Sequence, residues 1–266
     1  MHPYLSVIIP AYNEEKRIKE TLKKMVSYFS CQNYSCEIIV VDDGSCDQTA
    51  RIAESFAGIT VLRNKERKGK GAVVKKGVLS AAGDFILFSD ADLSAPIEEA
   101  GKLLFWLGKG YHIAIGSRAL PNSEIPIPQP FSRRLMGRLF NLLAKLIAVR
   151  GFSDTQCGFK CFEKRTAELL FQKQKLPGFC FDVEILYLAG KFKKEVKEVP
   201  IRWINSSASR VRPIRDSLLM LLDLFRIRLN NWRGLYKLPR NHEIKKTRKN
   251  RNSHCEQGPS LVIAIR

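Results

Sequence analysis

The sequence predicts an α/β fold in which a mostly parallel sheet is flanked by helices, and two observations lead to that prediction. Short apolar runs rich in β-branched residues alternate with longer segments whose apolar residues recur at helical spacing. From residue 5 to residue 88 the order is strand, helix, strand, helix, strand, helix, strand, which is typical of right-handed parallel crossovers. With 266 residues, 45% of them hydrophobic, the chain can bury a large core.

Seven segments make up this pattern. The predicted strands cover residues 5–10, 37–41, 60–62 and 85–88, and the predicted helices cover residues 15–29, 48–56 and 67–80. In the first helix the apolar residues Ile18, Leu22, Met25 and Phe29 fall on one face. The run at 85–88 is apolar throughout, which is typical of a strand that is buried on both faces.

Polar side chains follow three of these strands at their carboxyl ends. They are Asn13 and Glu14, Asp42 and Asp43, and Asp90 and Asp92. Open α/β sheets bind ligands at this edge. The two carboxylates of Asp90-Ala91-Asp92 repel each other, and a divalent ion bound to a phosphorylated ligand would relieve the repulsion. Taken alone, this motif could also be a polar turn at the end of a strand.

Lysines and glycines open the predicted helix at 67–80. The sequence Lys68-Gly69-Lys70-Gly71 can hold phosphate oxygens at a helix N-terminus. Its spacing differs from that of both the Walker A loop and the Gly-x-Gly-x-x-Gly fingerprint. The alternative is a solvated basic turn.

The composition narrows the class of partner and the compartment. A net charge of +19 and a pI near 9.8 indicate an anionic partner, which could be nucleic acid, an acidic membrane face or a phosphorylated substrate. The seven cysteines include no Cys-x-x-Cys pair, so the sequence predicts free thiols in a reducing compartment. We expect neither a signal peptide nor a transmembrane helix.

Two helices in the second half, near 132–149 and 213–231, have unusually wide apolar faces. They could be core helices or a dimer interface, but we favour helices that lie in the membrane interface. The segment from Lys237 to Arg251 supports this, because it holds seven Lys or Arg residues and one Glu. Alternatively the segment is a disordered tail without contacts, or it binds nucleic acid, although it lacks a recognisable binding module.

A set of ordered motifs resembles the GT-A fold of family 2 glycosyltransferases. The motifs are Pro10-Ala11-Tyr12-Asn13-Glu14, Val41-Asp42-Asp43-Gly44-Ser45, Lys68-Gly69-Lys70-Gly71 and Asp90-Ala91-Asp92. Further on, Gly116-Ser117-Arg118, residues 154–160 and residues 179–184 are similar to the polyprenyl-phosphate sugar transferases. Within these, the chain is most similar to the branch that transfers glucose to dolichyl phosphate, followed by the mannosyl branch. The resemblance covers about residues 4–235.

The resemblance implies a division into halves and a set of site residues. A Rossmann-like nucleotide-sugar half would cover 1–118 and an acceptor half 119–235, both within one domain. The basic composition of the remaining residues, 236–266, predicts a disordered tail. The implied nucleotide-sugar residues are Pro10, Ala11, Tyr12, Glu14, Asp42, Asp43, Lys70, Asp90, Ala91 and Asp92. Asp90 and Asp92 would also hold Mg²⁺ or Mn²⁺.

Four residues are expected at the acceptor phosphate. The resemblance implies Arg118 and Arg133 there, Gln156 is a candidate that lines the cleft between the halves, and Arg210 is a candidate from the loop before the second helix. The expected catalytic residues are Asp90, Asp92 and Arg118. Two positions depart from relatives, because Ser94 stands where mannosyltransferases often have Gln, and Gly137 stands where some relatives have a Ser.

The expected reaction is transfer of a hexose, with inversion, from a nucleotide sugar to dolichyl or undecaprenyl phosphate. UDP-glucose is the favoured donor and GDP-mannose the alternative. An anionic phosphate needs little help from a base, whereas a cell-envelope glycan as acceptor would require a carboxylate such as Asp154 or Asp182. The non-enzyme alternatives are a protein that binds nucleotide sugar or membrane and a basic nucleic-acid-binding protein.

We expect a peripheral protein on the cytoplasmic face of an anionic membrane. Nucleic acid is not an expected partner, and the sequence leaves the oligomeric state open.

Overall fold

A seven-stranded sheet forms the centre of the protein. The computed structural model of the chain describes residues 2–127, 130–205 and 213–238. The strands are β1 (Leu5–Ala11), β2 (Cys36–Asp42), β3 (Ile59–Arg63), β4 (Phe85–Ser89), β5 (Ile113–Ser117), β7 (Phe159–Glu163) and β8 (Val196–Pro200). Their order is β3-β2-β1-β4-β7-β5-β8, and only β7 runs antiparallel to its neighbours. The predicted, mostly parallel α/β fold is confirmed.

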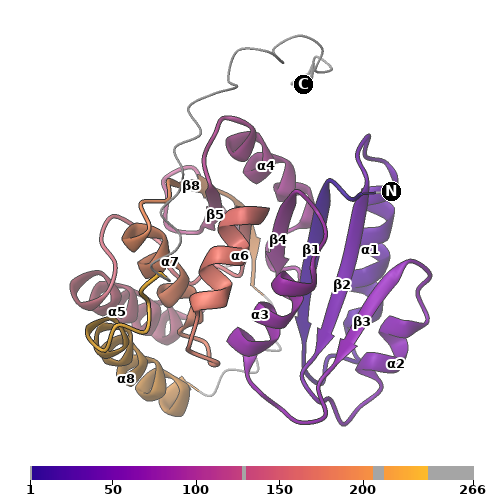
Figure 1. Cartoon of the computed structure of the whole chain (residues 1–266). Coiled ribbons are helices and arrows are strands. Elements are labelled where there is room, and N and C mark those ends of the chain that lie inside the picture. The colour runs from indigo at the N-terminus through magenta and orange to yellow at the C-terminus, as the bar shows by residue number, and fades with distance from the viewer. Residues whose placement is uncertain (1, 128–129, 206–212, 239–266) are drawn as a thin grey trace, which may run out of the picture.

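Helices cover both faces of this sheet. They are α1 (Ile18–Ser30), α2 (Thr49–Glu54), α3 (Lys70–Ser80), α4 (Ala100–Gly108), α5 (Phe131–Ile147), α6 (Lys164–Lys173), α7 (Phe181–Lys191) and α8 (Pro213–Trp232), with a 3₁₀ turn at Ile97–Glu99. Alternate side chains of a strand enter opposite cores, so Ile8 belongs to the core that includes residues of α3 and α6, whereas Val7 belongs to the core that includes residues of α1 and α4. The result is a three-layer α/β/α arrangement, in which α3 and α6 lie in front of the sheet in Figure 1.

A second, two-stranded sheet lies beside the main one. Parallel strands β6 (Glu124–Ile127) and β9 (Arg202–Ile204) form it. The proline-rich segment after Arg118 therefore contains a short strand, which pairs with β9. The Ile204 amide also donates to the Ser94 carbonyl at 2.7 Å, which ties this ribbon to the turn after β4.

The first helix is shorter than the periodicity predicts. Glu14 to Arg17 form a turn in which the Glu14 carbonyl accepts from the Arg17 and Ile18 amides, at 3.0 and 2.9 Å. The helix proper starts at Ile18 because this turn carries the chain away from the edge of the sheet.

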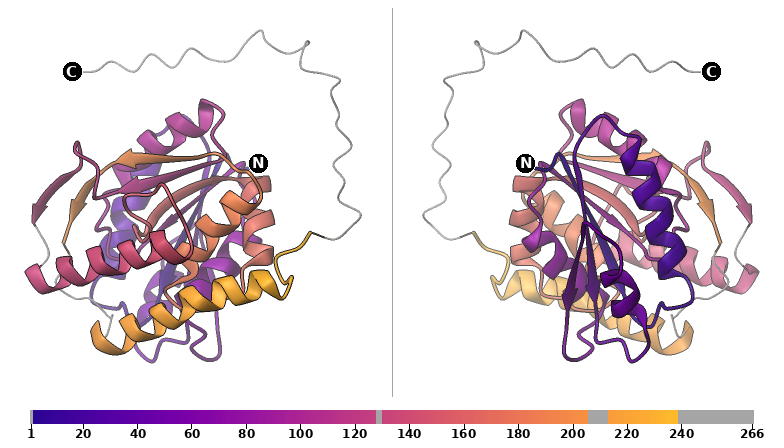
Figure 2. Two further views of the ribbon diagram at one scale, coloured as in Figure 1. Left: turned by 90° about the vertical axis from the view of Figure 1, so that its left-hand side faces the viewer. Right: turned by 90° about the vertical axis from the view of Figure 1, so that its right-hand side faces the viewer.

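Helices α5 and α8 lie side by side (Figure 2) and each has two apolar faces. Their inner faces are buried, as Ala144 and Leu224 are. Their outer residues are exposed, and we call them the outer apolar face: Leu135, Leu139, Leu142, Leu146, Leu218, Leu222, Phe225, Leu229 and Trp232. Among the described residues no helix is both long and apolar enough to cross a membrane.

The predicted basic tail lies almost wholly outside the described residues. Only its first three residues, 236–238, are described, and the first of them, Tyr236, is fully buried against the core.

Candidate active site

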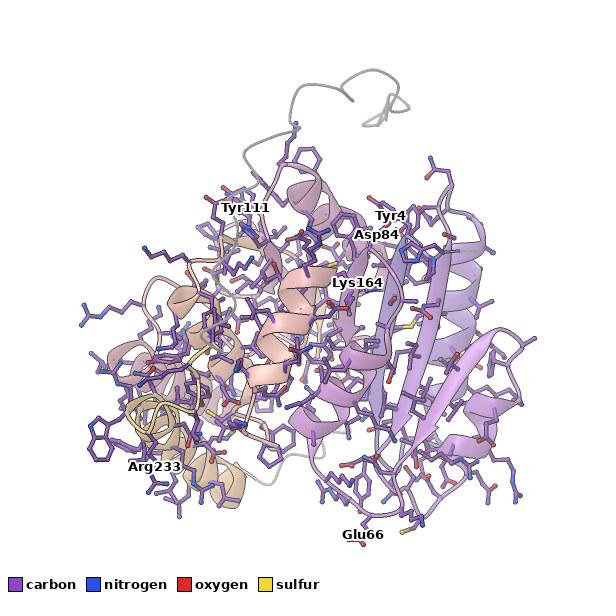
Figure 3. The ribbon with its side chains drawn as sticks, viewed as in Figure 1. Tyr4, Glu66, Asp84, Tyr111, Lys164 and Arg233 are labelled. Atoms are coloured by element: carbon purple, nitrogen blue, oxygen red, sulfur yellow. The ribbon has the colours of Figure 1, made fainter. Side chains whose placement is uncertain are left out.

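The carboxyl ends of the parallel strands meet at one edge of the sheet, as Figure 3 shows. Tyr4 and Asp84, which precede β1 and β4, lie at the upper end in that view. Glu66, which follows β3, lies at the lower end. The polar residues after β1, β2 and β4 therefore share the lower edge, as the sequence predicts.

Asp90 and Asp92 occupy the turn that follows β4. The Asp90 amide donates to the Gly158 carbonyl at 3.1 Å, and its carboxylate receives Lys70 Nζ at 2.6 Å. Asp92 Oδ1 accepts the Ser94 amide at 2.9 Å, across a left-handed turn at Leu93 with φ of 46°. Burial raises the pKa of Asp90; Lys70 opposes this effect and Asp92 adds to it. Additional positive charge near Asp90 and Asp92 would therefore stabilise the turn with both carboxylates ionised.

Lys70 reaches this turn because two glycines bracket it. Gly69 adopts φ of 97°, and a Cβ there would lie 2.6 Å from the Pro177 carbonyl oxygen. The backbone of the preceding turn does not face outward, because the Lys68 and Gly69 amides both donate to Asp43 at 2.8 Å. The predicted phosphate-holding role is thereby reduced for these two amides, and the Lys70 side chain is the group that points to the acidic turn.

The predicted nucleoside residues differ in how far the protein already uses them. Asp43 accepts three hydrogen bonds, from Lys68, Gly69 and the Asn64 side chain. Asp42 accepts the Ser45 amide through Oδ2, while its buried Oδ1 has no partner among the described residues. An N–H of a bound nucleobase would satisfy that oxygen, since an unpaired buried acceptor is costly.

Two arginines near the first loop were not singled out from the sequence. The Arg67 guanidinium lies over the Tyr12 ring, 4.3 Å from its centroid, and fixes one face of the ring. Arg17 binds the Glu14 carboxylate, with Nη2 2.7 Å from Oε1. Burial lowers the pKa of Arg17, but Glu14 raises it, and Asp92 and Asp90 add to the rise, so this cation also feels the charge of the acidic turn. Glu14 is thus partly engaged by the protein itself.

Three further predicted residues contribute through the backbone. Pro10 lies in β1 opposite Val41, and the Ala11 carbonyl accepts the Asp43 amide at 2.8 Å. The Ala91 carbonyl accepts the Thr21 hydroxyl at 2.6 Å, which fixes the acidic turn against α1.

Arg118, at the end of β5, makes a two-pronged ion pair with Asp154. Its Nε and Nη2 lie 2.6 and 2.9 Å from the two carboxylate oxygens, and its amide donates to the same group at 3.1 Å. Burial alone would raise the pKa of Asp154, but Arg118 lowers it to about 2. Among the described residues Nη1 of Arg118 has no hydrogen-bond partner, so the guanidinium keeps donors for an anionic ligand.

The loop that carries Asp154 is itself anchored. Glu198 accepts the Ser153 and Asp154 amides, and Asn141 of α5 donates to the Ser153 carbonyl at 2.6 Å. The next predicted residue is Gln156, whose backbone amide donates to the Asp154 carboxylate at 3.2 Å. The other two predicted acceptor residues fall outside what the structure describes, since it covers neither the side chain of Arg133 nor any part of Arg210.

A buried ion pair lies beneath the acidic turn. Lys160 and Asp182 are 1% and 4% exposed, and Nζ lies 2.5 Å from the carboxylate and 2.6 Å from the Cys157 carbonyl. Asp182 also raises the pKa of Lys70. Sequence reasoning assigned Lys160 no role, because only the fold places β7 against α7.

Asp90 and Asp92 fit a divalent cation that a ligand helps to hold. Carboxylate oxygens are what Mg²⁺ and Mn²⁺ prefer. Within the described part of the chain, however, no cluster of three or more His, Cys, Asp or Glu residues is arranged for a metal ion. The remaining ligands would therefore come from water and from the phosphates of a bound nucleotide.

Comparison with known proteins identifies the family. The family model "Glycosyl transferase family 2" matches residues 6–168, more than half of the chain. The chain belongs to this family. The prediction of a family 2 glycosyltransferase is thereby confirmed, and with it the prediction that the protein is an enzyme.

Curated relatives cover most of the chain. The dolichyl-phosphate β-glucosyltransferase of Drosophila melanogaster is 38% identical over 242 residues, which is 84% of this chain and 74% of that protein. The enzyme of the same name from Dictyostelium discoideum is 34% identical, over 88% of this chain and 77% of its own length. The predicted resemblance to the glucosyl branch is confirmed.

Two solved structures share the fold. Glucosyl-3-phosphoglycerate synthase of Mycobacterium tuberculosis, solved with Mn²⁺, UDP-glucose and glycerol 3-phosphate, is 22% identical, with a TM-score of 0.62 over 90% of this chain and 82% of that one. Mannosyl-3-phosphoglycerate synthase of Rubrobacter xylanophilus gives a TM-score of 0.65 at 20% identity, over 91% and 78% of the two chains. At these identities the likeness concerns the fold.

Proposed function

We propose that the protein transfers glucose from UDP-glucose to a polyprenyl phosphate, with inversion at the anomeric carbon. Relatives between 34% and 38% identical are named dolichyl-phosphate β-glucosyltransferases. The observation that carries the proposal is that the carboxylates suited to act as a base are already bound to cations.

Those carboxylates are Asp154 and Asp182. Asp154, with a pKa of about 2, is held by Arg118, and Asp182 is paired with Lys160 in the core. A sugar hydroxyl as acceptor needs a base to take its proton, and neither carboxylate is poised to do so. A phosphate acceptor is already anionic at neutral pH and needs cations instead. The described residues therefore favour a phosphate over a glycan hydroxyl.

The donor end of the reaction belongs to the acidic turn. Mg²⁺ or Mn²⁺ bound to Asp90 and Asp92 would neutralise charge on the departing diphosphate. Lys70, already beside Asp90, adds a positive charge from the end of α3. Tyr12 and the unpaired oxygen of Asp42 would take the nucleobase, and the backbone of Pro10, Ala11 and Ala91 fixes the loops around it.

At the acceptor end Arg118 would hold the lipid phosphate. Guanidinium groups bind phosphate through paired, charge-assisted hydrogen bonds. The donors of Arg118 not used by Asp154 are available for this, and Arg133, Gln156 and Arg210 are proposed to assist. These cations would offset the repulsion between the phosphate that attacks and the diphosphate that leaves.

The outer apolar face would lie on the membrane that carries the lipid. Exposed Arg134, Arg138, Arg226 and Arg228 belong to the same two helices. Each basic residue near an anionic leaflet contributes about 1 kcal/mol to binding. We propose peripheral binding at the cytoplasmic face, with the leucines of α5 and α8 in the lipid and these arginines at the headgroups.

Sugar transfer in vitro tests the proposal. The full chain is incubated with labelled UDP-glucose or GDP-mannose, with dolichyl or undecaprenyl phosphate, and with Mg²⁺, Mn²⁺ or a chelator. We expect metal-dependent label in the lipid fraction from UDP-glucose, and its loss in Asp92→Asn.

Two other results of this assay would contradict a part of the proposal. Label from GDP-mannose alone would replace glucose by mannose as the sugar. If neither donor labels lipid while the protein binds nucleotide, the polyprenyl phosphate acceptor is wrong.

A further inference from the structure

Glu184 of α7 makes three hydrogen bonds in the core that none of the steps above uses. Its side chain is 0% exposed and accepts the amides of Lys175 and Leu176 at 2.9 and 2.8 Å. The hydroxyl of Tyr236, also 0% exposed, donates to the same carboxylate at 2.5 Å. Because Tyr236 follows α8, Glu184 joins the end of that helix to the segment 174–177.

Segment 174–177 is pressed against the start of α3. The Pro177 carbonyl accepts the Ala72 amide at 3.2 Å. A Cβ at Gly69 would lie 2.6 Å from the Pro177 oxygen, and one at Gly71 would lie 2.7 Å from the Leu176 oxygen. At both glycines that flank Lys70, the backbone therefore packs so closely against this segment that a Cβ atom would not fit.

Lys70 is thus placed by contacts on both sides of its backbone. If the segment moved, the turn at residues 69–71 would have to move as well, and Nζ would no longer meet Asp90 at 2.6 Å. Packed interiors transmit such shifts because they lack the free volume to absorb them.

We propose that Glu184 is a positioning residue for the donor site, which holds segment 174–177 so that Lys70 stays on the acidic turn, and that Tyr236 aligns Glu184. This inference rests on the proposed function only in assigning Lys70 to the donor diphosphate. It makes α8, the last helix of the described residues, part of the support of the donor site.

The chemistry of the carboxylate explains why Glu184 suits this place. Two oxygens that only accept can serve two backbone amides and one hydroxyl. A Gln side chain has a single accepting oxygen, and its NH₂ group would face an amide donor. Glu184→Gln therefore keeps the volume of the side chain while releasing one end of the segment.

Binding of UDP with Mn²⁺ to the full chain, measured by titration calorimetry, is the test. We expect Kd to rise about tenfold in Glu184→Gln and about threefold in Tyr236→Phe, which keeps its ring but loses the hydrogen bond that the hydroxyl donates to Glu184 and the one that it accepts from Asn230. Thr166→Val is the matched control, because it removes another buried side-chain hydrogen bond, from Thr166 to Glu163 at 3.1 Å, away from the segment. Its Kd should stay within about twofold of the wild type.

A double-mutant cycle distinguishes a role of Glu184 in positioning Lys70 from a general loss of stability of the fold. Since Glu184 acts through Lys70, Glu184→Gln should change Kd by less than about twofold in a Lys70→Met background. Full additivity of the two effects would overturn the inference. So would an unchanged Kd in Tyr236→Phe, the variant that decides the question if Glu184→Gln does not fold.

The controls keep this failure distinct from failure of the proposed function. If wild type binds UDP and all three core variants weaken it in step with their unfolding temperatures, Glu184 is merely structural. If wild type itself does not bind UDP with Mn²⁺, the proposed donor is wrong and the inference falls with it.

Discussion

Lys70 and Asp90 neutralise each other at the edge of the sheet before any ligand is bound. Asp92 keeps a carboxylate oxygen without a described partner beside this pair. Burial raises the pKa of Asp90 despite Lys70, so a second cation would still be favoured there. Only a ligand that carries negative charge of its own can satisfy both Lys70 and a divalent ion.

Affinity for Mn²⁺ should therefore depend on the nucleotide. We expect UDP to tighten Mn²⁺ binding by at least about tenfold, because two carboxylates leave most coordination positions open. Free Mn²⁺ can be followed by electron paramagnetic resonance with and without UDP. Asp92→Asn should abolish the tightening, whereas Asp84→Asn, at the opposite end of the sheet, should not; equal affinities with and without UDP would contradict the shared site.

Gly158 determines where Asp90 can lie. A Cβ there would fall 2.0 Å from the Asp90 carboxylate oxygen Oδ2, and the Gly158 carbonyl accepts the Asp90 amide. Gly158→Ala should displace Asp90 and raise the Kd for UDP with Mn²⁺ by about tenfold or more. Gly101→Ala is the control, since a Cβ there meets no atom within 4 Å. If both variants bind like the wild type, the turn tolerates displacement and the prediction is wrong.

The ion pair between Asp154 and Arg118 should appear in the pH dependence of stability. The folded pKa of Asp154 is about 2, whereas an unfolded Asp titrates near about 3.9. A lowered pKa stabilises the fold above the unfolded value, and the contribution is lost as the pH falls from about 4 toward 2.

Urea unfolding at pH 6 and pH 3 measures this contribution. Between these pH values the wild type should lose about 1 kcal/mol more than Asp154→Asn, which has no carboxylate to titrate there. Equal losses would show that Arg118 does not hold Asp154 as the structure has it.

At the scale of elements, α5 and α8 each have an inner side that contacts the core and an outer side that is exposed. Asn141 on the inner side of α5 anchors the loop that carries Asp154, while Leu139 and Leu142 face outward. Tyr236 after α8 reaches Glu184, while Trp232 is 83% exposed. The exposed apolar residues of these two adjacent helices form one outer face, and apolar patches of this kind mark sites of interaction with proteins or membranes.

The outer apolar face should bind vesicles that contain anionic lipid. Leu139→Glu combined with Leu222→Glu should weaken binding in a flotation assay by at least about tenfold, because both apolar burial and attraction to the anionic surface are reduced. Leu79→Glu combined with Phe105→Glu, at exposed apolar residues of α3 and α4, is the control with the same change of charge and should bind like the wild type. Equal loss in the control would point to net charge rather than to this face.

Some elements were predictable and others were not, for a physical reason. β1, β2 and β4 are apolar runs whose pattern is local, so their residues and parallel order follow from the sequence. β7, with five residues, departs from that order: it runs antiparallel although a helix precedes it in the chain, and it pairs with β4, as in the pair of Phe85 with Glu163. Nothing in the local pattern of residues 159–163 encodes that pairing.

The same division runs through the site. Asp90 and Asp92 lie in a compact motif and could be identified from it. Lys160, Glu184 and Arg17 were missed, because a buried charge is recognised only once its partner is in place. The glycines that flank Lys70 were noticed, but the carbonyl groups that make them necessary come from residues 176 and 177.

For the whole molecule, the position of β7 matters most. It lies between β4 and β5, although both of these strands belong to the predicted donor half, residues 1–118, and β7 belongs to the predicted acceptor half. The two halves therefore contribute strands to one continuous sheet. The division into halves stays a prediction about function, because both halves share one sheet and two continuous cores.

This strand order has a consequence for folding of the protein during its synthesis on the ribosome. About 70 residues separate the end of β4 at Ser89 from the start of β7 at Phe159. At about 5–20 residues per second, the nascent chain exposes one edge of β4 for about 4–14 s before its neighbour is made. An open edge of apolar strand is a template for wrong pairing. Translation slowed within this window should therefore increase aggregation and the demand for chaperones, whereas the same slowing after residue 163 should not.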